Sequence, residues 1–163
     1  MNAKKIYFVE KSIPFNGDNL NSHLIAGSEK TLINISSELS KYDNLEIKVF
    51  NLTKQKKKFK GLEWNNLNEI NSYDIPDFLI AMSDANLLSL IKCKKKFLWS
   101  HSVQPFEKFL RKKQLFAYIK NKPTMILEGK YHYETRSFLT SFYGKKILPI
   151  SVDYDFIDTN VDE

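Results

Sequence analysis

The feature that most constrains this chain is the recurrence of short apolar runs separated by longer polar or helix-periodic stretches. Buried parallel strands read as short apolar runs, and a parallel pair needs a crossover of roughly a dozen residues or more, usually a helix. The alternation therefore predicts an α/β protein, with a parallel sheet and helices on both of its faces. A length of 163 residues suits one such domain.

The runs place the individual elements. Strands are expected at Lys5–Val9, Leu45–Asn51, Asp77–Met82, Lys96–Ser100, Pro123–Leu127 and Lys146–Ile150. Helices are expected at Ser28–Lys41, Ala85–Ile91, Pro105–Asn121 and Tyr131–Phe142. Ser28 is the expected N-cap of the first helix. No regular structure is expected at residues 53–72, which are rich in Lys and Asn.

The loop at Ile13–Gly27 is long for a connection between a strand and a helix, and long loops in compact domains often carry function. Ligands of open α/β sheets bind beyond the carboxyl ends of the strands, where this loop is expected to lie. At its end, Gly27 permits a close backbone approach, and the N–H groups of the following helix can face an anion. An ordinary glycine connection before a helix explains the same residues, so the pattern alone leaves both interpretations open.

The charge of the chain is +6, and its basic residues cluster. Three clusters stand out: Lys54, Lys56, Lys57, Lys58 and Lys60; Lys92, Lys94, Lys95 and Lys96; and Lys108, Arg111, Lys112 and Lys113. Such clusters suit nucleic acid, anionic lipid or phosphorylated substrates, and they equally suit a solvated surface. Because aromatic residues are not regularly interleaved with these lysines and no nucleic-acid motif is present, no nucleic-acid partner is expected.

Several chemistries and compartments are disfavoured. The sequence has no HExxH, CxxC, Walker or GxSxG motif, so metalloprotease, zinc-site, P-loop and serine-hydrolase functions are without support, and no metal is expected. The single cysteine, Cys93, allows no internal disulfide. No apolar run approaches the ~20 residues of a membrane-spanning helix, and the N-terminus lacks the apolar region of a secretory signal. A cytoplasmic location is expected.

Four segments, in matching order and spacing over nearly the whole chain, resemble the N-terminal domain of family 4 retaining glycosyltransferases of the GT-B architecture. Ala26–Ser40 is similar to the opening helix of that family, where Gly-Gly precedes Glu-Lys and an apolar helix. Leu45–Phe50 (LEIKVF) lies where the family has its second strand. Lys95–Ser102 (KKFLWSHS) resembles the strand that delivers a histidine to the interdomain cleft. Lys145–Ile157 (KKILPISVDYDFI) resembles the segment that leads into the second domain.

The resemblance implies that residues 1–157 form a Rossmann-like, acceptor-side domain and that residues 158–163 are a polar tail leading to a second domain. That second domain, which binds the nucleotide sugar in the family, lies outside these residues. The implied activity is transfer of a sugar, of the hexosyltransferase type, from a nucleotide-sugar donor to a glycan or a lipid-linked acceptor. The nucleotide sugar is a co-substrate, no other cofactor is expected, and this half is expected to be inactive alone.

The resemblance also assigns roles to single residues. His101 would contact the transferred sugar, and Gly27 with Ser28 would face the donor diphosphate. A structural histidine bonded to a backbone group is the alternative for His101. Acceptor-side candidates come from the first loop and from the start of the last helix: Asn16, Asp18, His23 and Tyr131. Solvation for His23 and ordinary packing for Tyr131 are the simpler explanations.

The sequence departs from the family pattern at three places. Ala26–Gly27 replaces the Gly-Gly pair, Ile150–Ser151 replaces Asn-Gly, and Leu127–Lys130 replaces the usual start of the last crossover. The alternative is a non-catalytic module with the same fold that binds a glycan or a partner, and it differs from half of an enzyme in whether a second domain completes it. The basic helix expected from Pro105 also carries Phe106, Phe109, Leu110 and Phe116. It suits peripheral contact with the inner face of an anionic membrane, or simple packing on the sheet with its cations in water.

Overall fold

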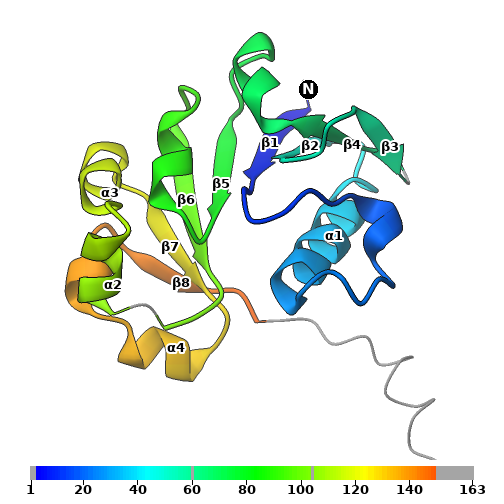
Figure 1. Ribbon diagram of the computed structural model, residues 1–163. Helices are drawn as coiled ribbons and strands as arrows, with labels where there is room; N and C mark the ends of the chain where they lie inside the picture. The colour runs from blue at the N-terminus through cyan, green and yellow to red at the C-terminus, as the bar shows by residue number, and fades with distance from the viewer. Residues whose placement is uncertain (1–2, 60, 104, 150–163) are drawn as a thin grey trace, which may run out of the picture.

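The computed structural model describes residues 3–59, 61–103 and 105–149. It confirms an α/β, Rossmann-like fold built on one eight-stranded sheet of order β3-β4-β2-β1-β5-β6-β7-β8 (Figure 1). The strands are β1 (Lys4–Val9), β2 (Leu45–Asn51), β3 (Lys57–Phe59), β4 (Leu62–Asn66), β5 (Phe78–Met82), β6 (Lys95–Ser100), β7 (Thr124–Leu127) and β8 (Lys145–Ile147). All neighbouring strands run parallel except the edge pair β3 and β4.

The helices cover both faces of this sheet. The α-helices are α1 (Gly27–Leu39), α2 (Phe106–Arg111), α3 (Leu115–Asn121) and α4 (Lys130–Thr135). Short 3-10 turns are η1 (Gly17–Asn19), η2 (Leu67–Ser72), η3 (Ala85–Ser89) and η4 (Phe138–Thr140). Figure 1 shows α1 on one side of the sheet and α2 and α3 on the other. None of the helices among the described residues is long and apolar enough to cross a bilayer.

Two apolar cores follow from this arrangement. On the α1 side, Leu32 and Ile33 pack with Phe15, Trp64 and Trp99, so the long loop after β1 contributes to the core. On the other side, Phe109 of α2 and Tyr118 of α3 pack over the central strands, with their rings 5.3 Å apart. Each face of the sheet is thus buried, as expected for parallel strands.

The strand order reverses between β1 and β5. From β1 the chain builds outward through β2 and β4, and from β5 it builds the other way through β6, β7 and β8. Such a topological switch point opens a crevice at the carboxyl ends of the strands, because the crossovers on its two sides turn to opposite faces. The loops after β1 and β5 therefore border the binding edge of this fold.

The prediction for residues 53–72 was wrong. They form the antiparallel hairpin β3–β4 and the turn η2. Leu62 and Trp64 are buried on one face of β4 and alternate with polar residues, a short pattern that the surrounding Lys and Asn residues obscure. Gly61 has a φ of 84°, which glycine adopts readily, and it makes the tight turn into β4.

Three predicted helices are shorter than expected. The helix at Ala85–Ile91 is only the 3-10 turn η3, and the helix at Tyr131–Phe142 is α4 followed by η4. The helix expected at Pro105–Asn121 is broken into α2 and α3, because Lys113 between them adopts a left-handed φ of 54°. Its first residue also differs: Pro105 is the N-cap of α2 and lies outside the helix. Tertiary packing of Phe109 and Tyr118 on the sheet outweighs a continuous helical pattern here.

Two further predictions concern the ends of elements. Ser28 is not the N-cap of α1: the cap is Ala26, and Ser28 lies inside the helix. The last strand ends at Ile147, whereas Ile150 and the tail at residues 158–163 lie outside the described residues.

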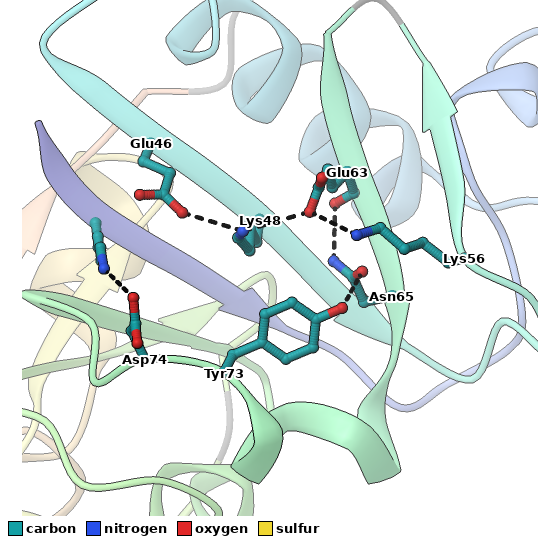
Figure 2. A network of polar contacts seen from close by, with 8 residues as sticks. Glu46, Lys48, Lys56, Glu63, Asn65, Tyr73 and Asp74 are labelled. Carbon is teal, nitrogen blue, oxygen red and sulfur yellow. Dashed lines mark hydrogen bonds and ion pairs between the residues drawn. The ribbon is translucent and has the colours of Figure 1, made fainter.

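A polar network lies on the part of the sheet formed by β2 and β4 (Figure 2). The ammonium of Lys48 lies 3.0 Å from a Glu46 carboxylate oxygen and 3.3 Å from one of Glu63, and Lys56 also reaches Glu63 at 3.3 Å. The Tyr73 hydroxyl donates to Asn65 at 2.8 Å, and the Tyr73 ring packs against Phe50. Through Tyr73, the network borders the apolar core that also contains Phe109 and Tyr118.

Candidate functional site

A crevice opens at the switch point, as the topology predicts. Its larger part is a cavity of about 380 Å³ between the loops after β1 and β5 and the joint between α2 and α3. The lining residues are Glu10, Lys11, Ser12, Met82, Ser83, Asp84, Asn86, Lys112 and Gln114. Its volume falls within the range of small-molecule sites.

A smaller cavity of about 110 Å³ adjoins the first and shares Glu10, Ser12, Met82 and Ser83 with it. It adds three residues from α1 and the end of β6: Ser28, Glu29 and His101. We refer to the two cavities together as the switch-point crevice. The crevice unites residues far apart in the sequence because β1, β5 and β6 are neighbours in the sheet.

Two buried carboxylates form the floor of the crevice. Glu10 accepts a hydrogen bond from the backbone N–H of Ser12 at 2.5 Å. Glu29 accepts from the Ser12 hydroxyl at 2.7 Å and from the Ser28 hydroxyl at 2.9 Å. Ser12 therefore bridges the two acids and fixes their separation.

The two carboxylates differ in acidity. Burial raises the pKa of Glu10 above its ordinary value, and the charge of Glu29 adds to the effect. Burial also raises the pKa of Glu29, but the hydroxyls of Ser12 and Ser28 outweigh it and lower that pKa on balance. The two environments thus push the pKa values of the neighbouring carboxyl groups in opposite directions.

His101 follows the last residue of β6 and is held from two sides. Its ring stacks on Trp99 with centroids 4.9 Å apart, and its Nδ1 contacts a carboxylate oxygen of Glu128, which follows β7. Its buried Nε2 has no hydrogen-bond partner among the described residues. Because a partner on one ring nitrogen fixes the role of the other, the contact with Glu128 orients the ring of this crevice-lining histidine and leaves the capacity of Nε2 to form a hydrogen bond unused.

Backbone strain is located at the same place. Ser83, directly after β5, has a left-handed φ of 54°, a conformation that costs on the order of 1 kcal/mol or more for a residue other than glycine. The buried Gln114 supports this loop, since its side chain donates to the Ser83 carbonyl at 3.4 Å and accepts from Ala85 N–H at 3.3 Å. Strained residues of this kind cluster at functional sites.

The structure brings some of the predicted site residues together. His101 and Ser28 line the same cavity, and Gly27 is the first residue of α1, where a Cβ would meet open space. The alternative for His101 was a structural role with a hydrogen bond to a backbone group. Among the described residues, the hydrogen-bond partner of His101 is the side chain of Glu128.

The predicted acceptor-side residues lie elsewhere. Asn16 caps η1 and accepts from Asp18 N–H, Asp18 pairs with Lys57, and His23 lies exposed in the long loop. Tyr131 of α4 is exposed rather than packed. Among the described residues that line the two cavities, none of these four is included.

Sequence reasoning did not single out several residues that line the crevice, among them Glu10, Ser12, Glu29, Ser83 and Gln114. A signal existed for Glu10 and Ser83, since each directly follows an expected strand at the carboxyl edge of the sheet. An acidic residue in the first turn of a helix, such as Glu29, is favoured by the helix dipole alone, so its residue type did not indicate that it lines a cavity. Nothing in the sequence pointed to Gln114, which lies in the break between α2 and α3. That break depends on tertiary packing, so the local helical pattern does not predict it.

The chemistry of this lining suits a ligand with several hydroxyl groups. Carboxylates, serine hydroxyls and an imidazole offer both donors and acceptors, and Met82 supplies an apolar surface. Within residues 3–59, 61–103 and 105–149, no cluster of three or more His, Cys, Asp or Glu side chains could hold a metal ion.

No protein-family model, no curated protein and no solved structure matches this chain. The sheet topology and the switch-point crevice are therefore the observations from which its function has to be argued.

Proposed function

We propose that this chain is the acceptor-side half of a glycosyltransferase, which transfers a sugar from a nucleotide-sugar donor to a glycan or lipid-linked acceptor. The observation that carries the proposal is the position of His101, oriented by Glu128, in one crevice with Ser28 and two buried carboxylates. The resemblance of four segments to family 4 glycosyltransferases supports it. In this proposal a second, nucleotide-sugar-binding domain closes over the crevice.

The carboxylates bind the acceptor. Glu29, ionised, accepts hydrogen bonds from sugar hydroxyls, and Glu10, with its raised pKa, donates or accepts at the same place. A hydrogen bond to a charged group contributes about 1.5–3 kcal/mol. The cavity of about 380 Å³ beside them accommodates a monosaccharide-sized group.

His101 and the start of α1 act on the donor side. The unpartnered Nε2 of His101 is placed to hydrogen-bond the sugar that is transferred. The first turn of α1 leaves backbone N–H groups without intrahelical partners, and at Gly27 a diphosphate can approach them closely. Since the leaving group is a nucleoside diphosphate, positioning and charge stabilisation carry most of the catalysis.

The test starts with the nucleotide sequence beyond the codon for Glu163. The complete encoded protein is then assayed for transfer from a panel of nucleotide sugars, with His101→Ala compared with the wild type. We expect a loss of transfer on the order of a hundredfold, since one hydrogen bond to the reacting sugar is removed. His23→Ala is the matched control: this exposed loop histidine lines neither cavity, so its substitution should leave transfer unchanged.

Two results would contradict the proposal. One is a complete protein that binds glycans but hydrolyses or transfers none of the nucleotide sugars, which indicates a non-catalytic binding module. The other is full transfer by His101→Ala, which would remove His101 from the reaction.

A further inference from the structure

An exposed apolar surface lies on α2, α3 and η4. Phe116 of α3 is 78% exposed and Phe138 of η4 is 68% exposed. The other exposed apolar side chains of this surface are Leu110, Ile119, Leu139 and Phe142. In α3, Phe116, Ile119 and Lys120 are three and four residues apart, so they share the face opposite the buried Ala117 and Tyr118.

The three elements pack against one another beneath these exposed side chains. A chain of rings joins them: Phe138 contacts Phe142 at 5.2 Å, Phe142 contacts Tyr143 at 5.3 Å, Tyr143 contacts Tyr118 of α3 at 5.2 Å, and Tyr118 contacts Phe109 of α2 at 5.3 Å. Figure 1 shows α2, α3 and the segment after α4 along the same side of the molecule. We refer to these elements as the α2–α3–η4 surface.

Cations surround the apolar side chains. Residues 105–122 contain six basic residues and one acid, Glu107; the basic residues are Lys108, Arg111, Lys112, Lys113, Lys120 and Lys122. Among the described residues, none of these six forms an ion pair with a carboxylate. The positive charge of this surface is therefore available to an external anionic partner.

The combination of exposed apolar side chains and unpaired cations favours a lipid bilayer over a protein or a nucleic acid as the partner. The cores of protein–protein interfaces are depleted in lysine. Nucleic acids offer phosphates and base stacking, but no apolar layer for Leu110 and Ile119. An anionic bilayer offers both an acidic headgroup layer and an apolar layer directly beneath it.

We propose that the α2–α3–η4 surface docks on an anionic lipid bilayer. The surface borders the switch-point crevice, because Lys112 between α2 and α3 also lines the larger cavity. Resting on the proposed function, it follows that the acceptor is a membrane-borne, lipid-linked sugar that enters the crevice past Lys112.

Vesicle co-sedimentation tests the docking. The protein is mixed with vesicles of phosphatidylcholine alone and with vesicles that also contain phosphatidylglycerol. We expect binding only to the anionic vesicles, weakening as salt shortens the Debye length from about 10 Å at 0.1 M. Arg111→Gln with Lys113→Gln removes two cations and should weaken binding about thirtyfold. Phe116→Ser removes an inserted ring and should weaken it about tenfold.

The matched controls make the same kinds of substitution outside the α2–α3–η4 surface. Lys92→Gln with Lys94→Gln removes two exposed charges from the opposite, amino-end edge of the sheet, and Ile75→Ser removes an exposed apolar side chain there. Both controls should bind anionic vesicles like the wild type. All the substituted residues are exposed, and thermal unfolding of each variant verifies that the fold is retained.

Three outcomes would overturn the docking proposal: no binding to anionic vesicles at low salt, equal losses in the surface and control variants, or a preference for single-stranded oligonucleotide over vesicles. Transfer to a water-soluble acceptor by the complete protein separates this test from the proposed function. Lost vesicle binding with intact transfer contradicts the docking alone, whereas intact vesicle binding without transfer contradicts the proposed activity alone.

Discussion

Two groups of carboxylates lie at different places on the same sheet, and their partners differ. In the network on β2 and β4, each lysine meets a carboxylate, and Lys48 meets two (Figure 2). In the switch-point crevice, Glu10 and Glu29 meet serine hydroxyls and backbone N–H groups, and no cation lies within 4 Å of either among the described residues.

The difference separates stabilising charges from charges held ready for a ligand. Paired charges satisfy one another and leave little capacity for an external group. Buried carboxylates without a cation, and the unpartnered Nε2 of His101, cost stability that the rest of the fold offsets. Buried polar groups without a partner are expected mainly at functional sites. This comparison supports the switch-point crevice as the candidate site and assigns the Figure 2 network to the scaffold.

The largest change in stability is expected at Lys48. Lys48→Met removes the cation shared by Glu46 and Glu63, so the two carboxylates lose their common partner. We expect the free energy of unfolding to fall by about 1–2 kcal/mol, measured by urea denaturation. Lys54→Met, at an exposed position, is the control and should change it by less than about 0.5 kcal/mol. Equal effects would show that the network does not stabilise the sheet.

A smaller effect, on function rather than stability, is expected at Glu128. Glu128→Gln keeps the shape of the side chain but removes the carboxylate that orients His101. Transfer by the complete protein should fall about tenfold, since one charged hydrogen bond is weakened. Glu134→Gln, on the exposed side of α4, is the matched control. If transfer by Glu128→Gln matches that of the control, Glu128 does not position His101.

The smallest effect concerns pH. Burial raises the pKa of Glu10 in the folded state, so ionisation opposes folding as pH rises from the ordinary glutamate pKa through the raised one. Glu10→Gln removes this penalty. The stability of the variant relative to the wild type should therefore increase across that pH window and stay constant above it, as measured by thermal unfolding.

Glu63→Gln should change the pH dependence of stability in the direction opposite to Glu10→Gln. Burial raises the pKa of Glu63, but Lys56 and Lys48 outweigh it and lower that pKa on balance. The ionised carboxylate therefore stabilises the fold above the ordinary pKa, and this stability is lost as pH falls through the lowered value. The variant should lose stability relative to the wild type as pH rises. Parallel pH profiles for Glu10→Gln and Glu63→Gln would remove the distinction between the two clusters.

The strands were the most predictable elements, and the short helices the least. Apolar runs such as those of β1, β2 and β6 are buried on both faces of the sheet, so the local sequence is enough to predict a strand there. The helical pattern after Pro105 gave no sign of the break at Lys113, because that break depends on how Phe109 and Tyr118 pack on the sheet. The β3–β4 hairpin was missed because its buried residues are too few to show a period.

The sequence by itself determined the fold class, and the resemblance to family 4 glycosyltransferases pointed to two residues that line the crevice, Ser28 and His101. Burial of short apolar strands needs only local hydrophobicity, and a polar residue directly after a strand, such as His101, falls at the binding edge of any parallel sheet. Only the tertiary structure decided which residues meet there. Glu10 and Glu29 come from the connection between β1 and β2, whereas Glu128 follows β7; strand order brings the first two into one cavity with His101, which Glu128 contacts. Long-range pairing of strands, which local sequence does not encode, is the physical reason.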